Sequence, residues 1–238
     1  MYGFSASPPT HPAEPLEPTA SATDTQAPAD ATASPIAARM AELRELAATD
    51  PAGAQVSTWA WIKELGARKA ADELGELYKL GEPPRGLDGP TEGILVTPLI
   101  QGTVDSALTT ITGAWMPWLG KAFDAEANRG YNRLASSARW PAKLLWPLYE
   151  TKEEPGARAA FDFETAIEPG KADPDVQVLK IDYGPVESNP RLIIRSIRDE
   201  LVQLVPDTYL GKILWRSEDD GEERYSCIGY FALRQPAT

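Results

Sequence analysis

The sequence predicts a mainly β protein, in which two N-terminal helices precede an antiparallel barrel over residues 83–238. Apolar residues at helical spacing end near residue 82. Short β-branched or alternating runs bounded by turn residues follow, which is typical of a barrel or a sandwich. A closed barrel has no unpaired edge strand. We prefer the barrel because the C-terminal runs carry large apolar side chains on two faces.

Residues 1–34 are rich in Pro, Ala, Ser and Thr, and the first basic residue of the chain is Arg39. Large apolar side chains are almost absent after Phe4, so burial cannot offset the entropy of ordering this segment. We predict a disordered tail, which either has no function of its own or acts as a tether; the alternative is an interaction segment.

The first helix is predicted to begin at Pro35, because Ser34 is a good N-terminal cap and proline is favoured at the first helical position. The helix continues towards Asp50, and its apolar positions are Ile36, Met40, Leu43 and Leu46.

The second helix is predicted to begin after Ser57 or Thr58 and to end at Gly81, which two prolines follow. Gly66 and Gly75 weaken it, so we expect either two joined pieces or one helix that leans on a larger body. Residues 35–82 then pack on the barrel as a lid, which either fills space or controls access of a ligand.

Strands are predicted in several segments after residue 90, from their β-branched, aromatic or alternating side chains. In residues 105–123 the first part is compatible with a helix, but Thr109–Thr112 favour a strand. The remaining predicted strand segments are residues 92–102, 130–140, 142–153, 157–170 and 175–184.

Two hairpins are predicted at the C-terminal end. Residues 197–205 are compatible with a helix, but Pro206-Asp207 is typical of a turn, so we predict that 200–205 pairs with 208–215. Residues 208–216 and 224–234 form the second hairpin, which has an acidic exposed loop.

The tetrad WLGK at residues 118–121 recurs as YLGK at residues 209–212. Neither has the glycine spacing or the Ser/Thr of a phosphate-binding P-loop. In a strand, the lysine projects on the face opposite the aromatic residue, and the glycine marks a bend or a close neighbour. Each lysine is then either exposed beside a core aromatic, or reaches a cavity where it binds an anionic or carbonyl head group.

The acidic balance, with a net charge of −12 and a pI near 4.6, disfavours nucleic acid and anionic membranes as partners. Cys227, the single cysteine, allows no intrachain disulfide, and the cytoplasm is the expected compartment. The single histidine, His11, lies in the tail, which leaves no histidine for a catalytic triad or a histidine-rich metal site. No apolar run is long enough for a membrane span, and we expect neither metal nor cofactor.

The segment WMPWLGKAFD at residues 115–124 is similar to the Trp-x-Gly-Lys-x-Phe block of small lipocalin-like proteins of the GXWXG type. Residues 197–216, with YFALR at 230–234, resemble the C-terminal part of the same proteins. The resemblance covers residues 85–235 in patches, and Thr91 stands where the name-giving tryptophan is expected, which indicates an uncharacterised branch. It implies a lipocalin-like barrel with room for a cavity, and it implies no particular chemistry.

Two polar pairs are candidate sites. Asn132 and Arg133 after Gly130 either bind a carboxylate or form a structural hydrogen bond at a strand bend. Lys180 and Asp182 share one strand face, as an exposed ion pair or as an acid–base pair inside the barrel. Arg198-Asp199-Glu200 is expected on a solvated face. The interior is expected to be filled or lined by Trp115, Trp118, Tyr209, Trp215, Tyr230 and Phe231.

We therefore predict a non-enzymatic protein that binds a small hydrophobic molecule in the barrel. One alternative is a cofactor-independent cyclase or isomerase, which uses Asp182 with tyrosine or lysine partners. Another is a structural or interaction module with a filled barrel. The predicted ligand-binding residues are Lys121, Asn132, Arg133, Lys180, Asp182, Tyr209, Lys212, Trp215 and Tyr230.

Overall fold

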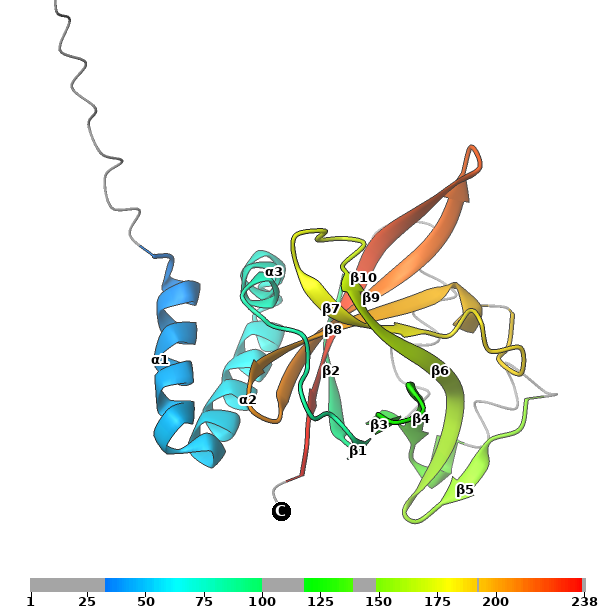
Figure 1. Ribbon diagram of the computed structural model, residues 1–238, viewed down its shortest axis with the longest axis horizontal. Helices are drawn as coiled ribbons and strands as arrows, with labels where there is room; N and C mark the ends of the chain where they lie inside the picture. Colours follow the sequence, from blue (N-terminus) through cyan, green and yellow to red (C-terminus); the bar gives the residue numbers. More distant parts are fainter. Residues whose placement is uncertain (1–32, 100–117, 139–148, 192, 237–238) are drawn as a thin grey trace, which may run out of the picture. The chain divides into compact units, whose positions relative to one another are not determined.

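The computed structural model describes residues 33–99, 118–138, 149–191 and 193–236, which form a mainly β unit (Figure 1). Its helices are α1 (Pro35–Thr49), α2 (Pro51–Ala67) and α3 (Ala71–Lys79), with short 3₁₀ turns η1 (Ser136–Ala138) and η2 (Ile194–Ser196). Its strands are β1 (Gly89–Pro90), β2 (Glu92–Pro98), β3 (Trp118–Asp124), β4 (Arg129–Leu134), β5 (Lys152–Glu154), β6 (Ala157–Pro169), β7 (Gln177–Asp182), β8 (Ile197–Val205), β9 (Thr208–Asp219) and β10 (Glu222–Arg234).

Several expectations fall outside the described residues. These are nearly all of the disordered tail, with His11, the β preference of Thr109–Thr112, the place of Trp115 in the interior, and most of the strand expected over 142–153.

The N-terminal caps set where the helices begin. Ser34 caps α1 as predicted, and its hydroxyl accepts a hydrogen bond from the N–H of Ala37. The predicted start of the second helix at Ser57 or Thr58 is wrong, because Asp50 caps α2 seven residues earlier and accepts a hydrogen bond from the N–H of Gly53. Both helices begin with proline, which has no N–H group and therefore leaves no unpaired donor at the first helical position.

The second predicted helix is divided into α2 and α3, which confirms the expectation of two joined pieces. The break lies at Arg68–Ala70, where Lys69 adopts a positive φ of 53°, and not at Gly66 or Gly75. The side chain of Gln55 in α2 donates hydrogen bonds to the carbonyls of Asp207 and Gln235, and so ties the helices to the sheet.

All strand pairs are antiparallel, and the ten-stranded sheet has the order β1-β3-β4-β6-β7-β8-β9-β10-β2, with β5 attached to β6. Among the described strands, the pairing does not close this sheet into a barrel, because β1 and β2 stand at its two ends. Thr91 lies between them in the chain, and its N–H donates to the carbonyl of Lys121 in β3 at 2.8 Å.

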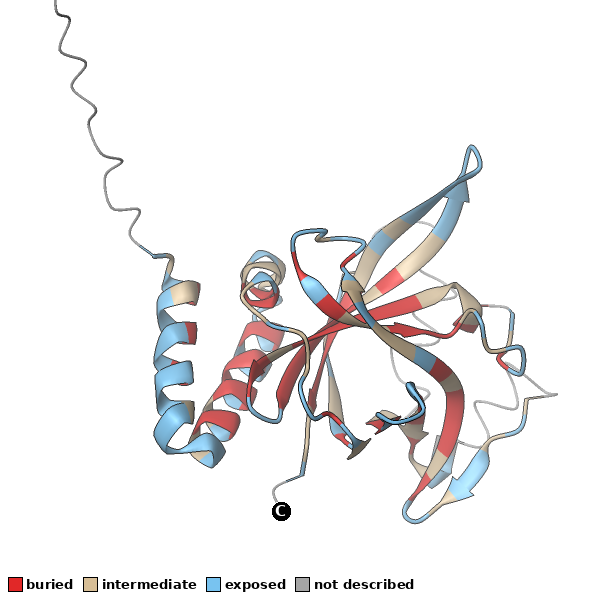
Figure 2. Cartoon of the chain, viewed as in Figure 1, coloured by how far each residue is buried: buried red, intermediate tan, exposed pale blue. Residues whose placement is uncertain are grey.

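The hairpin prediction over Pro206-Asp207 is confirmed, because β8 and β9 pair on either side of this turn and Asp207 has a φ of 58°. The second hairpin is also confirmed, but the loop in the structure is shorter than the predicted one. The strands extend to Asp219 and from Glu222, so only Asp220 and Gly221 form the turn. The exposed tip of this hairpin projects away from the rest of the sheet (Figures 1 and 2).

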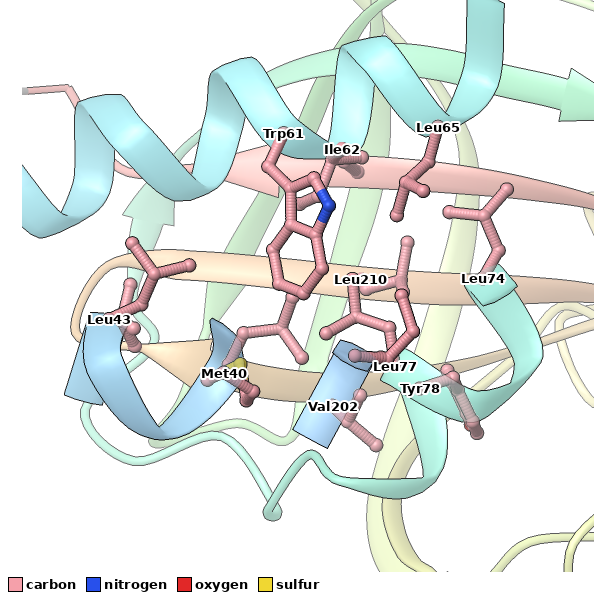
Figure 3. Packing of buried hydrophobic residues seen from close by; sticks show 14 of the residues in the cluster. Met40, Leu43, Trp61, Ile62, Leu65, Leu74, Leu77, Tyr78, Val202 and Leu210 are labelled. Atoms are coloured by element: carbon pink, nitrogen blue, oxygen red, sulfur yellow. The ribbon is translucent and has the colours of Figure 1, made fainter. Parts of the chain in front are cut away.

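Both faces of the sheet bury apolar side chains. On the helix-covered face, side chains of α1–α3 pack against Val202 of β8 and Leu210 of β9 (Figure 3). On the opposite face, residues of β3, β4, β6, β7, β8, β9 and β10 form a second cluster, which we call the cavity-side cluster; its members include Phe123, Phe163, Ile181, Leu201 and Phe231. The sheet therefore curves around the cavity-side cluster, while the helices cover its outer side.

Candidate functional site

A cavity of about 340 Å³ opens within the cavity-side cluster. Most of its wall is apolar and comes from strands that are far apart in the sequence. The apolar lining includes Leu95, Leu134, Ile197, Ile213, Ile228 and Phe231. Of the described residues, four with polar side chains share this wall, and they are Lys121, Asn132, Tyr183 and Asp199.

The four polar residues form one hydrogen-bonded group, which we call the polar cluster. The ammonium group of Lys121 donates to Asp199 Oδ2 at 2.8 Å, to Asn132 Oδ1 at 3.0 Å and to the hydroxyl oxygen of Tyr183. The hydroxyl of Tyr183 donates to the same Asp199 oxygen at 2.9 Å and accepts from Asn132 Nδ2 at 3.0 Å. A charge pair thus lies at the wall of an otherwise apolar cavity.

The polar cluster is nearly closed to solvent, since the side chains of Lys121 and Asp199 are only 3% and 6% exposed. Burial lowers the pKa of Lys121, because the ammonium loses its hydration, and Asp199 partly opposes this shift. Burial, together with the charge of Asp199, holds the pKa of Tyr183 well above its usual value. Tyr183 is therefore a neutral hydrogen-bond donor at physiological pH.

Aromatic rings surround the ammonium group. Lys121 Nζ lies 5.2 Å from the ring centroids of both Tyr183 and Phe231, 5.3 Å from that of Phe163 and 5.7 Å from that of Trp118. Ring faces attract a cation, so these contacts offset part of the hydration that the lysine loses.

The local backbone of the first tetrad turns both Trp118 and Lys121 towards the cavity. The pairing of β3 with β4 shifts register between Trp118 and Gly120, and Gly120 has a φ of 141°. As a result, the indole N–H of Trp118 and the ammonium of Lys121 both donate to Asn132 Oδ1. The prediction that Lys121 projects opposite its aromatic neighbour is therefore wrong, because a bulge breaks the alternation of the strand.

The second tetrad follows the predicted alternation. Tyr209 belongs to the cavity-side cluster, whereas Lys212 lies on the helix-covered face, where it pairs with Asp173 and lies 4.5 Å from the ring centroid of Tyr78. Gly211 leaves room for the ring of Phe231, which a Cβ atom would approach to 2.2 Å. The interpretation of the lysines as exposed is wrong for both tetrads, because Lys121 and Lys212 are 2% and 6% exposed.

Of the nine residues predicted to bind a ligand, the structure brings Lys121 and Asn132 together at the cavity. The other seven do not line it. Arg133 instead forms an ion pair with Glu154 at 2.8 Å, Lys180 with Glu168 at 3.5 Å, and Asp182 with Arg216 at 3.0 Å. Tyr209 donates to Gln235, Trp215 is half-buried in β9, and Lys212 and Tyr230 lie on the helix-covered face.

The expectation of a solvated face for Arg198-Asp199-Glu200 is wrong, because these residues are 2%, 4% and 0% exposed. Asp199 faces the cavity. Arg198 and Glu200 point to the opposite side of β8, where Arg198 contacts both Glu168 and Glu200 at 2.8 Å. The helices and the loop after β6 cover that side, so charges that alternate along the strand are buried on both faces.

Sequence reasoning missed Asp199 and Tyr183 as site residues. A signal was present, because strand alternation places Asp199 on the same face as Leu201, and Tyr183 on the same face as Ile181. A charged side chain in register with core residues must find a partner inside the protein.

The described parts of the chain contain no group of three or more His, Cys, Asp or Glu side chains arranged to hold a metal ion. Within the same ranges, no helix combines the length and the apolar character needed to cross a membrane. No family model, curated protein or solved structure matches the chain. The fold and the site therefore define it by its architecture: an antiparallel sheet, covered by helices on one face, with an apolar cavity and a buried polar cluster on the other.

Proposed function

We propose that the protein binds a small hydrophobic molecule in the cavity of the cavity-side cluster and holds the polar end of this molecule at the polar cluster. The observation that carries this proposal is an apolar cavity of about 340 Å³ with the Lys121–Asp199 pair in its wall. Small-molecule sites of this size class are mostly apolar, with a few polar groups that orient the ligand. A purely structural module would be expected to fill this space with side chains.

The resemblance to lipocalin-like proteins of the GXWXG type supports the same proposal. We infer that the curved sheet is a lipocalin-like barrel whose ends meet at Thr91, the residue in place of the family's tryptophan. The hydrogen bonds of Thr91 support this inference, because its N–H and its hydroxyl both donate to the carbonyl of Lys121 at 2.8 Å.

A cofactor-independent isomerase or cyclase is the second candidate. The observation that favours it is the contact between Tyr183 and Asp199 at 2.9 Å, which places two titratable groups within hydrogen-bond distance at the cavity. Asp199 would act as the proton acceptor in place of Asp182, which pairs with Arg216 and does not line the cavity. Turnover of a bound ligand, lost in Asp199→Asn, would separate this candidate from simple binding.

The binding proposal is tested with the neutral fluorescent dye N-phenyl-1-naphthylamine, which brightens in apolar surroundings. We expect saturable binding by the full chain. Ile213→Trp, which fills the cavity from its wall, is expected to weaken binding by at least about tenfold, because the dye and the indole compete for the same space.

The matched control is Ile167→Trp, since Ile167 also lies on a strand but is 51% exposed and does not line the cavity. This variant should bind the dye as the natural chain does. If the natural chain binds no dye, or if both tryptophan variants bind it equally well, the cavity is not a binding site.

A further inference from the structure

The donors of the polar cluster are all used within the protein. An ammonium group has three N–H donors, and those of Lys121 have three acceptors, on Asp199, Asn132 and Tyr183. The hydroxyl proton of Tyr183 is given to Asp199, and the indole N–H of Trp118 to Asn132. Asn132 Nδ2 donates to Tyr183 and, at 3.5 Å, to the carbonyl of Phe161. Within the described part of the chain, no donor of the polar cluster remains free for a ligand.

One acceptor of the cluster is unused. Asp199 Oδ2 accepts from both Lys121 and Tyr183, whereas Asp199 Oδ1 is buried and has no hydrogen-bond partner among the described residues. A buried carboxylate oxygen without a partner is costly, so this atom has much to gain from a donor. The side chain of Asp199 is part of the cavity wall, next to the space where a ligand would lie.

The charge of the cluster is already balanced. Among the residues that the structure describes, Lys121 and Asp199 are the only charged side chains in the cavity wall, and they form a pair. An anionic ligand would therefore bring an uncompensated charge into an apolar space, next to the free oxygen of a carboxylate. A ligand with only acceptor groups would leave Asp199 Oδ1 unpaired.

We propose that the cavity selects a neutral apolar molecule that carries a hydroxyl or N–H group, and that this group donates a hydrogen bond to Asp199 Oδ1. This rests on the proposed function and specifies its ligand class as apolar alcohols, phenols or amides. It also excludes the role that the sequence suggested for Lys121, the capture of an anionic or carbonyl head group, because the lysine has no donor left.

The test compares three probes with the same ring system as competitors of N-phenyl-1-naphthylamine on the full chain at pH 7. They are 2-naphthol, a neutral donor, 2-methoxynaphthalene, which only accepts, and 2-naphthoate, an anion. We expect 2-naphthol to bind at least about tenfold more tightly than either of the others, as one hydrogen bond to a charged acceptor allows.

The second part of the test repeats the probe comparison on the variant Asp199→Asn. Lys121 and Tyr183 both need the side-chain oxygen, so the amide group should take the place of Oδ1 and turn an acceptor into a donor. The preference is then expected to reverse, with 2-methoxynaphthalene bound more tightly than 2-naphthol. If this variant does not fold, the comparison on the natural chain still decides.

The outcomes separate the two proposals. Binding of 2-naphthoate or 2-methoxynaphthalene as tight as that of 2-naphthol would overturn the inference about ligand class while the cavity stands as a binding site. Failure of every probe and of the dye to bind would overturn the proposed function, and the inference with it.

Discussion

Two opposite charges at the wall of an apolar cavity are the main feature at the scale of single residues. Removing Lys121 and Asp199 from water carries a large cost, which their contact at 2.8 Å, the hydroxyl of Tyr183 and the amide of Asn132 offset together. Such a group is stable as a set and unstable when one member is removed, because the charge that is left has no partner.

Lys121→Met tests this dependence. We expect a loss of about 3–5 kcal/mol in the free energy of unfolding, because the substitution leaves the Asp199 carboxylate buried without its cation. The measurement is urea unfolding at pH 7.

The control for that measurement is Lys152→Met, which removes a lysine of the same kind from an ion pair with Asp162 at 3.6 Å. The side chain of Lys152 is 79% exposed, so the change should stay below about 1 kcal/mol. Equal losses in the two variants would mean that the Lys121 pair is not energetically special.

At the scale of elements, the bulge in β3 decides which side chains reach the cavity. Gly120 has a φ of 141°, and a Cβ atom added there would lie 2.3 Å from the carbonyl oxygen of Thr91. The glycine therefore permits both the unusual backbone conformation and the close approach of the β1–β2 connection. Both Trp118 and Lys121 depend on it for their orientation.

We expect Gly120→Ala to destabilise the protein by more than about 2 kcal/mol and to weaken dye binding, because the backbone must shift away from Thr91. Chemical denaturation and dye titration of the same sample measure the two effects. Gly156→Ala is the control, since Gly156 also has a positive φ, of 73°, but open space around it. It should cost about 1–2 kcal/mol and leave the dye affinity unchanged.

The three helices act as a cover for one face of the sheet, and their buried side chains reach strands β8–β10 and β2 (Figure 3). Leu65→Ala in α2 is expected to cost about 2–5 kcal/mol, because the side chain is fully buried and its loss leaves a cavity. Leu46→Ala in α1 is the matched variant, because Leu46 is 36% exposed and its loss should cost less than half as much. Thermal unfolding of both variants gives the comparison, and similar losses would argue against a packed helix layer.

At the scale of the whole molecule, the sheet buries polar and aromatic side chains on both of its faces. Burial raises the pKa of tyrosines in both clusters, namely Tyr78, Tyr183, Tyr209 and Tyr230. It also raises the pKa of Tyr149 to about 12. These groups remain protonated in the folded state at a pH where the unfolded chain already ionises.

The stability of the protein is therefore expected to fall as the pH rises above about 10, the pKa of tyrosine in an unfolded chain. The contribution of each raised tyrosine is complete below that pH and decreases by about 1.4 kcal/mol per pH unit above it. Lys121, whose pKa is lowered, acts in the opposite direction, but it is one group against several. Urea unfolding between pH 8 and pH 11 measures the slope.

Tyr209→Phe provides the control for this pH dependence, because Tyr209 does not line the cavity and, among the described residues, the hydrogen bond of its hydroxyl goes to Gln235. In this variant, the free energy of unfolding should fall less steeply above pH 10, by the contribution of one tyrosine. A stability that does not change between pH 8 and pH 11 would contradict the burial of these hydroxyls.

Local patterns in the sequence determined much of the architecture. The alternation in residues 175–184, the turn at Pro206-Asp207 and the Ser34–Pro35 cap each depend on interactions within a few residues, and the strands and the helix start follow them. These features need no knowledge of distant segments. The start of α2 was predicted wrongly because Asp50, which precedes Ser57 and Thr58 in the chain, caps the helix instead.

The site was decided by the tertiary structure. Lys121 and Asp199 are 78 positions apart, and only the curvature of the sheet brings β3 and β8 to one cavity. Local alternation would turn Lys121 away from Trp118, but the approach of Thr91 to Gly120 imposes a bulge that reverses this. The burial of Arg198 and Glu200 likewise depends on what covers the outer face of β8. Side-chain direction and burial are properties of the assembled layers, and a single strand cannot specify them.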